Sequence, residues 1–296
     1  MVMSGATSML VRRTSQRLFR FPPGDPVVEQ IFLYCLGYAA AETGVQVHGW
    51  ILLSNHYHVV VTDTRGTGPE FYQKLNQNIA ALIKRHFGLP EEIWNTSQTS
   101  VTDLSDKEHP SEEAVLERLQ YTLGNAQISG LVRRWWQWEG ALSKPEDMGQ
   151  RVVRVRRPAC ASRRTTLPEA VELRVTVPPV LAHWERSELI AALRELLRSL
   201  PEPERPLGMK RVHEQGIWDR PNTPPKKRSR GERVAGDPAR RQAKLAVLRA
   251  FHADYERSME RHRAGEPCVF PRGTWKMVRL FNVPVEGGAD PPAEAA

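Results

Sequence analysis

The spacing of apolar residues divides the first half of the chain into strands and helices. Runs rich in β-branched and aromatic residues at Met9–Arg13, Val45–Leu53 and His56–Thr62 predict strands, and turn residues join the last two into an antiparallel pair. Apolar positions three and four residues apart predict helices over Val27–Ala41 and Glu70–Phe87. Such a mixture of the two periods is typical of a fold that combines a sheet with helices.

A further strand and a further helix complete this pattern. Strand character returns at Thr99–Leu104, and Pro110-Ser111 with two glutamates behind it opens a helix that we expect to continue to Asn125. The order strand, helix, strand, strand, helix, strand, helix is a split β-α-β arrangement. We therefore expect an α+β domain over residues 1–140, with helices packed on one antiparallel sheet.

The remaining residues, 141–296, are expected to form a basic, mostly helical accessory region. Helical spacing predicts an amphipathic helix at Ser187–Ser199 and a long basic helix at Asp237–His262. Residues 140–180 are rich in arginine and broken by prolines, and their pattern assigns neither helix nor strand. The expected linkers and tail are Pro201–Pro206, Pro221–Gly236 with the basic run Lys226–Arg230, and a disordered Gly287–Ala296.

Charge is distributed unevenly between the two halves. The chain has 42 Lys and Arg against 34 Asp and Glu, a net charge of +8. Residues 1–150 carry a balance of −3 and residues 151–296 a balance of +11. A strongly basic half beside a nearly neutral one suggests a polyanionic partner such as nucleic acid, although solvated basic tails are also common.

Composition narrows the class of protein further. With 296 residues, of which 40% are hydrophobic, the chain can bury a core without disulfides. Cys35, Cys160 and Cys268 lie far apart in the sequence and are expected to be reduced thiols. No stretch approaches the roughly 20 apolar residues of a membrane span, and the N-terminus does not resemble a signal peptide. We therefore expect a cytoplasmic protein with no membrane partner.

Two histidines on one predicted strand are the first candidates for chemistry. His56 and His58 are two positions apart, so their side chains share one face of the strand, about 7 Å apart at their roots. Neutral imidazoles at this spacing can converge on one metal ion. Two such residues also occur by chance, but two polar rings on one face of an apolar strand need an explanation. Tyr57, between them, faces the other way.

A tyrosine and an asparagine on the last predicted helix are the second pair of candidates. Tyr121 and Asn125 are four residues apart, so they share one helix face. A tyrosine hydroxyl becomes a useful nucleophile when its target is polarised, for example by a metal, and an amide oxygen can be a metal ligand. Taken alone, the same two residues are more typical of a tyrosine at the core edge and an asparagine near a helix end.

Together the two pairs resemble a known family. The segment Gly49–Val61, with its His-Tyr-His, resembles the core motif of the HUH single-strand nucleases, and especially of the REP-associated tyrosine transposases, a group of single-tyrosine HUH transposases. Tyr121–Ala126 followed by Ser129–Val132 resembles the family's Tyr-x-x-x-Asn-Pro and Gly-Leu-Val segments. The resemblance covers residues 9–138 and extends beyond them only to the short segment Val269–Thr274.

The resemblance implies a fold, a reaction and a cofactor. It implies a ferredoxin-like HUH domain in which His56, His58 and Asn125 bind Mg²⁺ or Mn²⁺, and Tyr121 attacks a phosphate of single-stranded or hairpin DNA. The product would be a 5′-phosphotyrosine and a free 3′-hydroxyl. Imidazoles alone would suit zinc better, so the choice of metal comes from the resemblance. Bound to DNA, such a protein would be associated with the nucleoid, and it could act as a homodimer.

Several basic residues are candidates for nucleic-acid contacts. Arg12 and Arg13 resemble the family's first strand, while the other candidates are basic residues beside aromatic rings, which can hold phosphates and stack on unpaired bases. Solvated helix ends beside core tryptophans would show the same pattern. These other candidates are Lys84 and Arg85 at the end of the second predicted helix, and Arg133 and Arg134 beside Trp135, Trp136 and Trp138.

One difference from the family pattern and two rival functions remain. Ala126 stands where the family has proline, which should matter little because Gly130 can still end the helix. The first rival is a catalytically silent protein of the same fold that binds a DNA hairpin. The second is a two-histidine metal hydrolase acting on another substrate, which would need neither Tyr121 nor the basic half.

Overall fold

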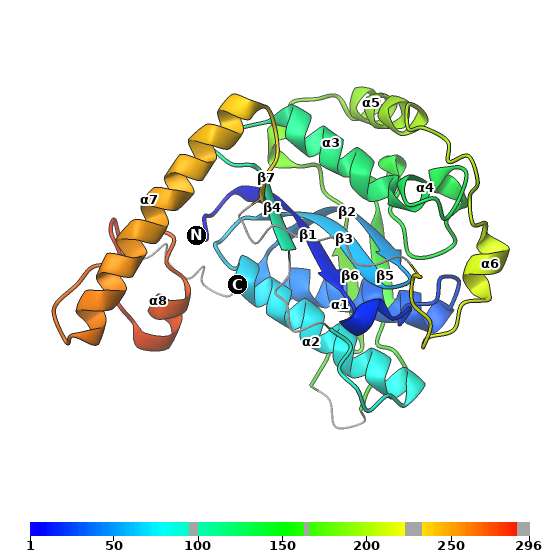
Figure 1. Ribbon diagram of the computed structural model, residues 1–296, viewed down its shortest axis with the longest axis horizontal. Helices are drawn as coiled ribbons and strands as arrows, with labels where there is room; N and C mark the ends of the chain where they lie inside the picture. Colours follow the sequence, from blue (N-terminus) through cyan, green and yellow to red (C-terminus); the bar gives the residue numbers. More distant parts are fainter. Residues whose placement is uncertain (95–99, 163–165, 223–232, 289–296) are drawn as a thin grey trace.

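The computed structural model describes residues 1–94, 100–162, 166–222 and 233–288. Its first part follows the predicted order of elements, with a sheet between two layers of helices (Figure 1). The elements of this part are β1 (Ala6–Arg13), α1 (Pro26–Thr43), β2 (Gln46–Leu53), β3 (His56–Asp63), α2 (Gly68–Phe87), β4 (Ser100–Ser105), α3 (Glu112–Leu123) and α4 (Asn125–Ile128).

The strand order is that of a ferredoxin-like fold. Among the described residues the main sheet has five strands in the order β2-β3-β1-β4-β7, where β7 is Arg233–Val234. The first four strands pair antiparallel, while β7 runs parallel to β4. His58 therefore lies in the middle of the sheet, between Val11 of β1 and Ile51 of β2. The expected α+β class with helices packed on an antiparallel sheet is confirmed.

Each face of the sheet is covered by different helices. On one face α1 and α2 pack on Leu10, Tyr57 and Val59. On the other face α3 packs on Met9 and Val60, and α5 (Arg186–Arg198) packs outside α3. Alternation along each strand thus sends neighbouring residues into two separate cores.

Local sequence explains where the helices begin and end. The Asp25 carboxylate accepts hydrogen bonds from the backbone N–H groups of Val27 and Val28, at 2.8 and 3.1 Å, and so caps α1 as expected from the Asp-Pro pair. Gly44 ends α1 with a φ of 72°, in the left-handed region that glycine adopts without strain.

The helix expected to reach Asn125 is shorter than predicted. α3 ends at Leu123, and Asn125 is the first residue of α4 beyond Gly124. A Cβ on Gly124 would lie 2.3 Å from a methyl carbon of Leu200 and 3.5 Å from one of Leu197, so this glycine allows the chain after α5 to approach α3 closely. The prediction that Tyr121 and Asn125 lie on one continuous helix is wrong, because the helix is interrupted between them.

Residues beyond 140 contribute to the same cores. The hairpin of β5 (Val152–Arg156) and β6 (Ala170–Arg174), which lies in the segment left unassigned above, packs on α1 through Val155, Val171 and Leu173. β7 falls within the stretch predicted as a linker, and it joins the main sheet instead. A domain boundary near residue 140 stays a prediction.

The C-terminal part is helical, as expected. α7 (Pro238–Arg263) runs from the edge of the sheet to a small cluster around Phe270, Met277 and Val283 (Figure 1). The basic run Lys226–Arg230 and most of the predicted tail lie outside the described residues. No helix in the described ranges is long and apolar enough to cross a membrane. The remaining short elements are α6 (Met209–His213), α8 (Lys276–Phe281) and the 3₁₀ turns Ser15–Arg17, Trp135–Gln137, Pro145–Asp147 and Pro179–Leu181.

Candidate active site

His56 and His58 lie together on the face of the sheet that α3 covers. Their ring centroids are 5.0 Å apart and the rings meet edge to face, so the predicted placement on one face is confirmed. Both residues are buried. The Nδ1 atom of His56 is 2.7 Å from the side-chain oxygen of Asn55, so this bond would hold the ring by its Nδ1–H and leave Nε2 as an acceptor.

The imidazole ring of His58 is buried in an unusual environment. Neither of its ring nitrogens has a hydrogen-bond partner among the described residues. Burial, together with the positive charges of Arg13 and Arg118, lowers the pKa of His58 to about 3. The ring is therefore neutral near pH 7, which is the form that binds metal. A buried polar group without partners costs free energy, so the position of His58 is not explained by packing alone.

His48 shows what a satisfied buried histidine looks like in the same sheet. Its Nε2 lies 2.7 Å from the Thr62 hydroxyl and its Nδ1 lies 3.0 Å from the Thr176 carbonyl oxygen. Burial lowers the pKa of His48 to about 4, partly opposed by the bond to the backbone of Thr176. Because both nitrogens are occupied, His48 is not a ligand candidate, in contrast to His58.

Tyr121 lies directly against His58. The two ring centroids are 5.4 Å apart with an angle of 75° between the rings. Tyr121 is carried by α3, whose residues Val115 and Leu119 are buried against the sheet, so packing of the helix brings the tyrosine to the histidine strand. Arg118, one turn earlier on the same helix, holds its guanidinium carbon 5.7 Å from the centre of the Tyr121 ring.

Asn125 is buried beyond the helix break. Its side-chain oxygen accepts a hydrogen bond from the Ser129 hydroxyl at 3.2 Å. An amide oxygen has two lone pairs, so this bond leaves one for another partner. In the described part of the chain no cluster of three or more His, Cys, Asp or Glu side chains is arranged to hold a metal. The role of Asn125 as third ligand stays a prediction.

Tyr57 belongs to the opposite face. It is fully buried, packs against Phe32 and Trp94, and donates a hydrogen bond from its hydroxyl to the side-chain oxygen of Asn76 at 3.0 Å. The expectation that alternation turns Tyr57 away from the histidines is confirmed.

A cleft of 440 Å³ opens beside His58 and Tyr121. Four arginines line it, and no carboxylate among the described residues does, so its field is strongly positive. The polar lining groups are Arg13, His58, Ser100, Thr102, Arg118, Tyr121, Arg233 and Arg241, and the remainder is apolar. A cleft with this lining suits an anion such as phosphate.

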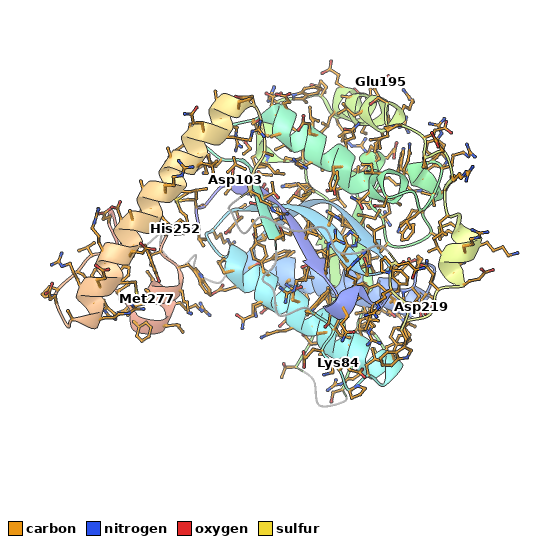
Figure 2. The ribbon with its side chains drawn as sticks, viewed as in Figure 1. Lys84, Asp103, Glu195, Asp219, His252 and Met277 are labelled. Carbon is orange, nitrogen blue, oxygen red and sulfur yellow. The ribbon has the colours of Figure 1, made fainter. Side chains whose placement is uncertain are left out.

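The structure separates the two predicted arginines of the first strand. Arg13 lines the cleft, whereas Arg12 points to the other face, where its guanidinium carbon lies 5.9 Å from the centre of the Trp94 ring. Lys84 and Arg85 lie on α2, across the sheet from α3, and Lys84 (labelled in Figure 2) forms an ion pair with Glu92 at 3.6 Å. Arg12, Lys84 and Arg85 therefore lie away from the cleft.

Arg133 and Arg134 form a third, separate group. Both pair with Glu202, and the Arg133 contact measures 3.3 Å. The Arg134 guanidinium carbon also lies 5.9 Å from the ring centre of Trp136, which is 55% exposed. Their positive charge is partly compensated by Glu202, and neither residue lines the cleft.

Three of the arginines that line the cleft were not predicted from the sequence: Arg118, Arg233 and Arg241. Arg118 had a local signal, because it lies three residues before Tyr121 on the same predicted helix. Arg233 and Arg241 had no such signal. They lie more than a hundred residues after the other site residues, and only the pairing of β7 with β4 brings them to the cleft.

Comparisons with known proteins give partial likenesses. No family model matches the sequence, and no curated protein matches it. The fold is similar to the REP-associated tyrosine transposase bound to a REP hairpin, with 13% identity, a TM-score of 0.38, and coverage of 47% of this chain and 76% of that one. It is also similar to a proposed transposase from Deinococcus radiodurans R1, with 19% identity, a TM-score of 0.29, and coverage of 39% and 86%. Because both TM-scores are low, the fold assignment above rests on the strand order and not on these two likenesses.

Proposed function

We propose that this protein cleaves and rejoins single-stranded or hairpin DNA through a covalent bond to Tyr121. The observation that carries the proposal is the contact of Tyr121 with His58, at 5.4 Å between ring centroids, inside a cleft lined by four arginines. Nucleophile, metal-binding group and phosphate-binding charge thus lie together, although they come from different elements of the fold.

The residues present fit a divalent metal. His56 and His58 are adjacent and buried, and both nitrogens of His58 lack a hydrogen-bond partner among the described residues. Asn125 is the proposed third ligand. Mg²⁺ or Mn²⁺ bound by these residues would polarise a phosphate oxygen and stabilise the negative charge that develops on it.

The proposed reaction is a transesterification. The Tyr121 oxygen attacks the phosphorus, the bond from phosphorus to the 3′ oxygen breaks, and the phosphate remains attached to the tyrosine and to the 5′ side. The tyrosine loses its proton and the departing 3′ oxygen gains one. Because one phosphate ester bond forms as another breaks, the number of phosphodiester bonds is unchanged. The reverse step joins a 3′-hydroxyl to the same phosphate, and no ATP is required.

Exposed aromatic residues support an unpaired substrate. Trp136 and Trp218 are each 55% exposed, and each lies over an arginine. The guanidinium of Arg134 is 5.9 Å from the first ring and that of Arg20 is 4.1 Å from the second. Such pairs stack on unpaired bases, which duplex DNA does not offer.

A silent DNA-binding protein is the second candidate. It is favoured by the single observation that the Asn125 amide oxygen already accepts a hydrogen bond from Ser129. Such a protein would use the arginine cleft without breaking a bond.

One experiment separates the two candidates. The full chain is incubated with single-stranded oligonucleotides that carry hairpins, in Mg²⁺ or Mn²⁺, and then run on a denaturing gel. The proposal predicts a shifted covalent band that disappears in EDTA. Binding on a native gel without a covalent band in either metal would support the silent protein and contradict cleavage.

A further inference from the structure

Basic residues at the start of α7 fall into two sets with different surroundings. Arg240 and Lys244 are buried and pair with acidic residues in β4 and just after it: Arg240 with Asp103 at 2.8 Å, and Lys244 with both Asp103 and Asp106. Asp103, labelled in Figure 2, lies where β4 meets α7. These ion pairs neutralise their own charges and fix the first turns of α7 against the sheet.

Arg241 belongs to the other set. It is exposed and lines the cleft together with Leu245, which lies one turn later on the same face of the helix. No acidic residue in the described part of the chain pairs with it. Because Arg240 beside it is anchored by its ion pair, the backbone of Arg241 is held at the rim of the cleft, while its charge is left free for a ligand.

Arg233 reaches the cleft from the neighbouring element. Its backbone pairs with Thr102 of β4, and its guanidinium donates to the Ser100 hydroxyl at 3.0 Å. A neutral hydroxyl orients the guanidinium but does not compensate its charge, so most of the five N–H donors remain for another acceptor.

Arg118 lines the cleft from α3. It lies against the Tyr121 ring, and its Nε atom is buried without a hydrogen-bond partner among the described residues. Together with Arg13, these three arginines place four like charges around one cleft, a repulsive arrangement unless an anion lies between them.

We propose that Arg118, Arg233 and Arg241 form a phosphate clamp that holds the backbone of a single DNA strand beside Tyr121. This inference rests on the proposed function, and it assigns two of the three clamp residues to the chain beyond residue 230. Guanidinium groups bind phosphate oxygens in a bidentate manner, which fixes position as well as charge. The C-terminal region would then complete the site, and not merely add general positive charge.

The clamp can be tested without cleavage. Binding of a labelled single-stranded oligonucleotide of mixed sequence is measured in EDTA at several salt concentrations, with the full chain carrying Tyr121→Phe. Arg241→Ala and Arg118→Ala should each lower the slope of log affinity against log salt by about 0.7, the value for one lost phosphate contact on a single strand. Arg249→Ala is the matched control, since it removes the same charge from an exposed position on α7 outside the cleft.

The conservative variant separates charge from geometry. Arg118→Lys should keep the slope and weaken binding several-fold, because lysine retains the charge and loses the planar fork. Equal slopes for Arg241→Ala and Arg249→Ala would overturn the clamp, and so would a protein that does not bind the oligonucleotide. Failure of the proposed function looks different, since the clamp slopes would then persist while the metal-containing assay shows no covalent band.

Discussion

At the residue scale, two neighbours on β3 have opposite surroundings. Tyr57 is packed between aromatic rings with its hydroxyl bonded to Asn76, while His58 is buried with both nitrogens open and with Tyr121 against its edge. The alternation of a strand is enough to predict which side each residue takes. It is not enough to predict which of them lacks hydrogen bonds, because that depends on α3 and β1.

The metal assignment makes a prediction at this scale. His56→Ala combined with His58→Ala should abolish the metal-dependent covalent band, because both proposed imidazole ligands are lost. The fold should persist, since neither ring nitrogen of His58 forms a hydrogen bond within the described chain. Circular dichroism checks the fold and the denaturing gel checks the band. A double variant that forms the band at the wild-type rate in Mn²⁺ would show that the assignment is wrong.

His48 makes a prediction about pH. Its pKa falls from an ordinary 6.5 to about 4 on folding, mainly because of burial. Between these two pH values the unfolded chain therefore binds a proton at His48 and the folded chain does not. The resulting stability is present above pH 6.5 and is lost as pH falls towards 4. Between about pH 7 and about pH 5, the free energy of unfolding of His48→Gln should fall by about 2 kcal/mol less than that of the wild type. Parallel curves for the two proteins in urea titrations would contradict this.

At the element scale, the first four strands and the helices between them follow from local pattern, whereas three features do not. The α3 helix stops before Asn125, at Gly124, where Leu197 and Leu200 approach from a part of the chain that is distant in sequence. The β5-β6 hairpin has two strands of five residues each, so the alternation of apolar and charged residues extends over too few positions to assign a strand. β7 has only two residues and pairs with the sheet edge within a predicted linker.

The close approach at Gly124 predicts the effect of a methyl group. Gly124→Ala should lower the free energy of unfolding by about 1–3 kcal/mol, because the added carbon overlaps Leu200 and lies 2.9 Å from the backbone oxygen of Gln120. Gly216→Ala is the control, since its nearest neighbour would be 3.5 Å away. Urea denaturation measures both variants. Equal stabilities would show that the chain after α5 does not press on Gly124.

At the scale of the whole molecule, the basic residues of the second half have two distinct roles: some form ion pairs that hold α7, and others line the cleft. Arg240 and Lys244 attach α7 to β4 and to the residue after it, and Arg241 lines the cleft that Tyr121 also lines. The sequence showed a basic half and not which of its charges are neutralised, because Asp103 and Asp106 lie about 140 positions earlier.

Breaking the attachment of α7 should lower the stability of the protein. Lys244→Ala removes the main partner of the Asp106 carboxylate, whose side chain is only 7% exposed, and should lower the free energy of unfolding by about 3–5 kcal/mol. Burial alone would raise the pKa of Asp106, and the bonds from Lys244 and from the backbone of His109 outweigh it and lower the pKa. Lys244→Met with Asp106→Leu replaces the pair by apolar groups and should regain most of the loss. If urea titrations show Lys244→Ala as stable as wild type, α7 is not held by this pair.

The identity of the nucleophile is tested most directly by mass spectrometry of the trapped DNA complex. Tyr121→Phe keeps the ring that packs against His58 and lacks the oxygen that would join the phosphate. It should bind the oligonucleotide like wild type and form no covalent band, whereas Tyr57→Phe should still form one. In the wild-type complex the phosphate should map to Tyr121. A phosphate mapped to Tyr57, to Tyr72 or to any other residue would contradict the account.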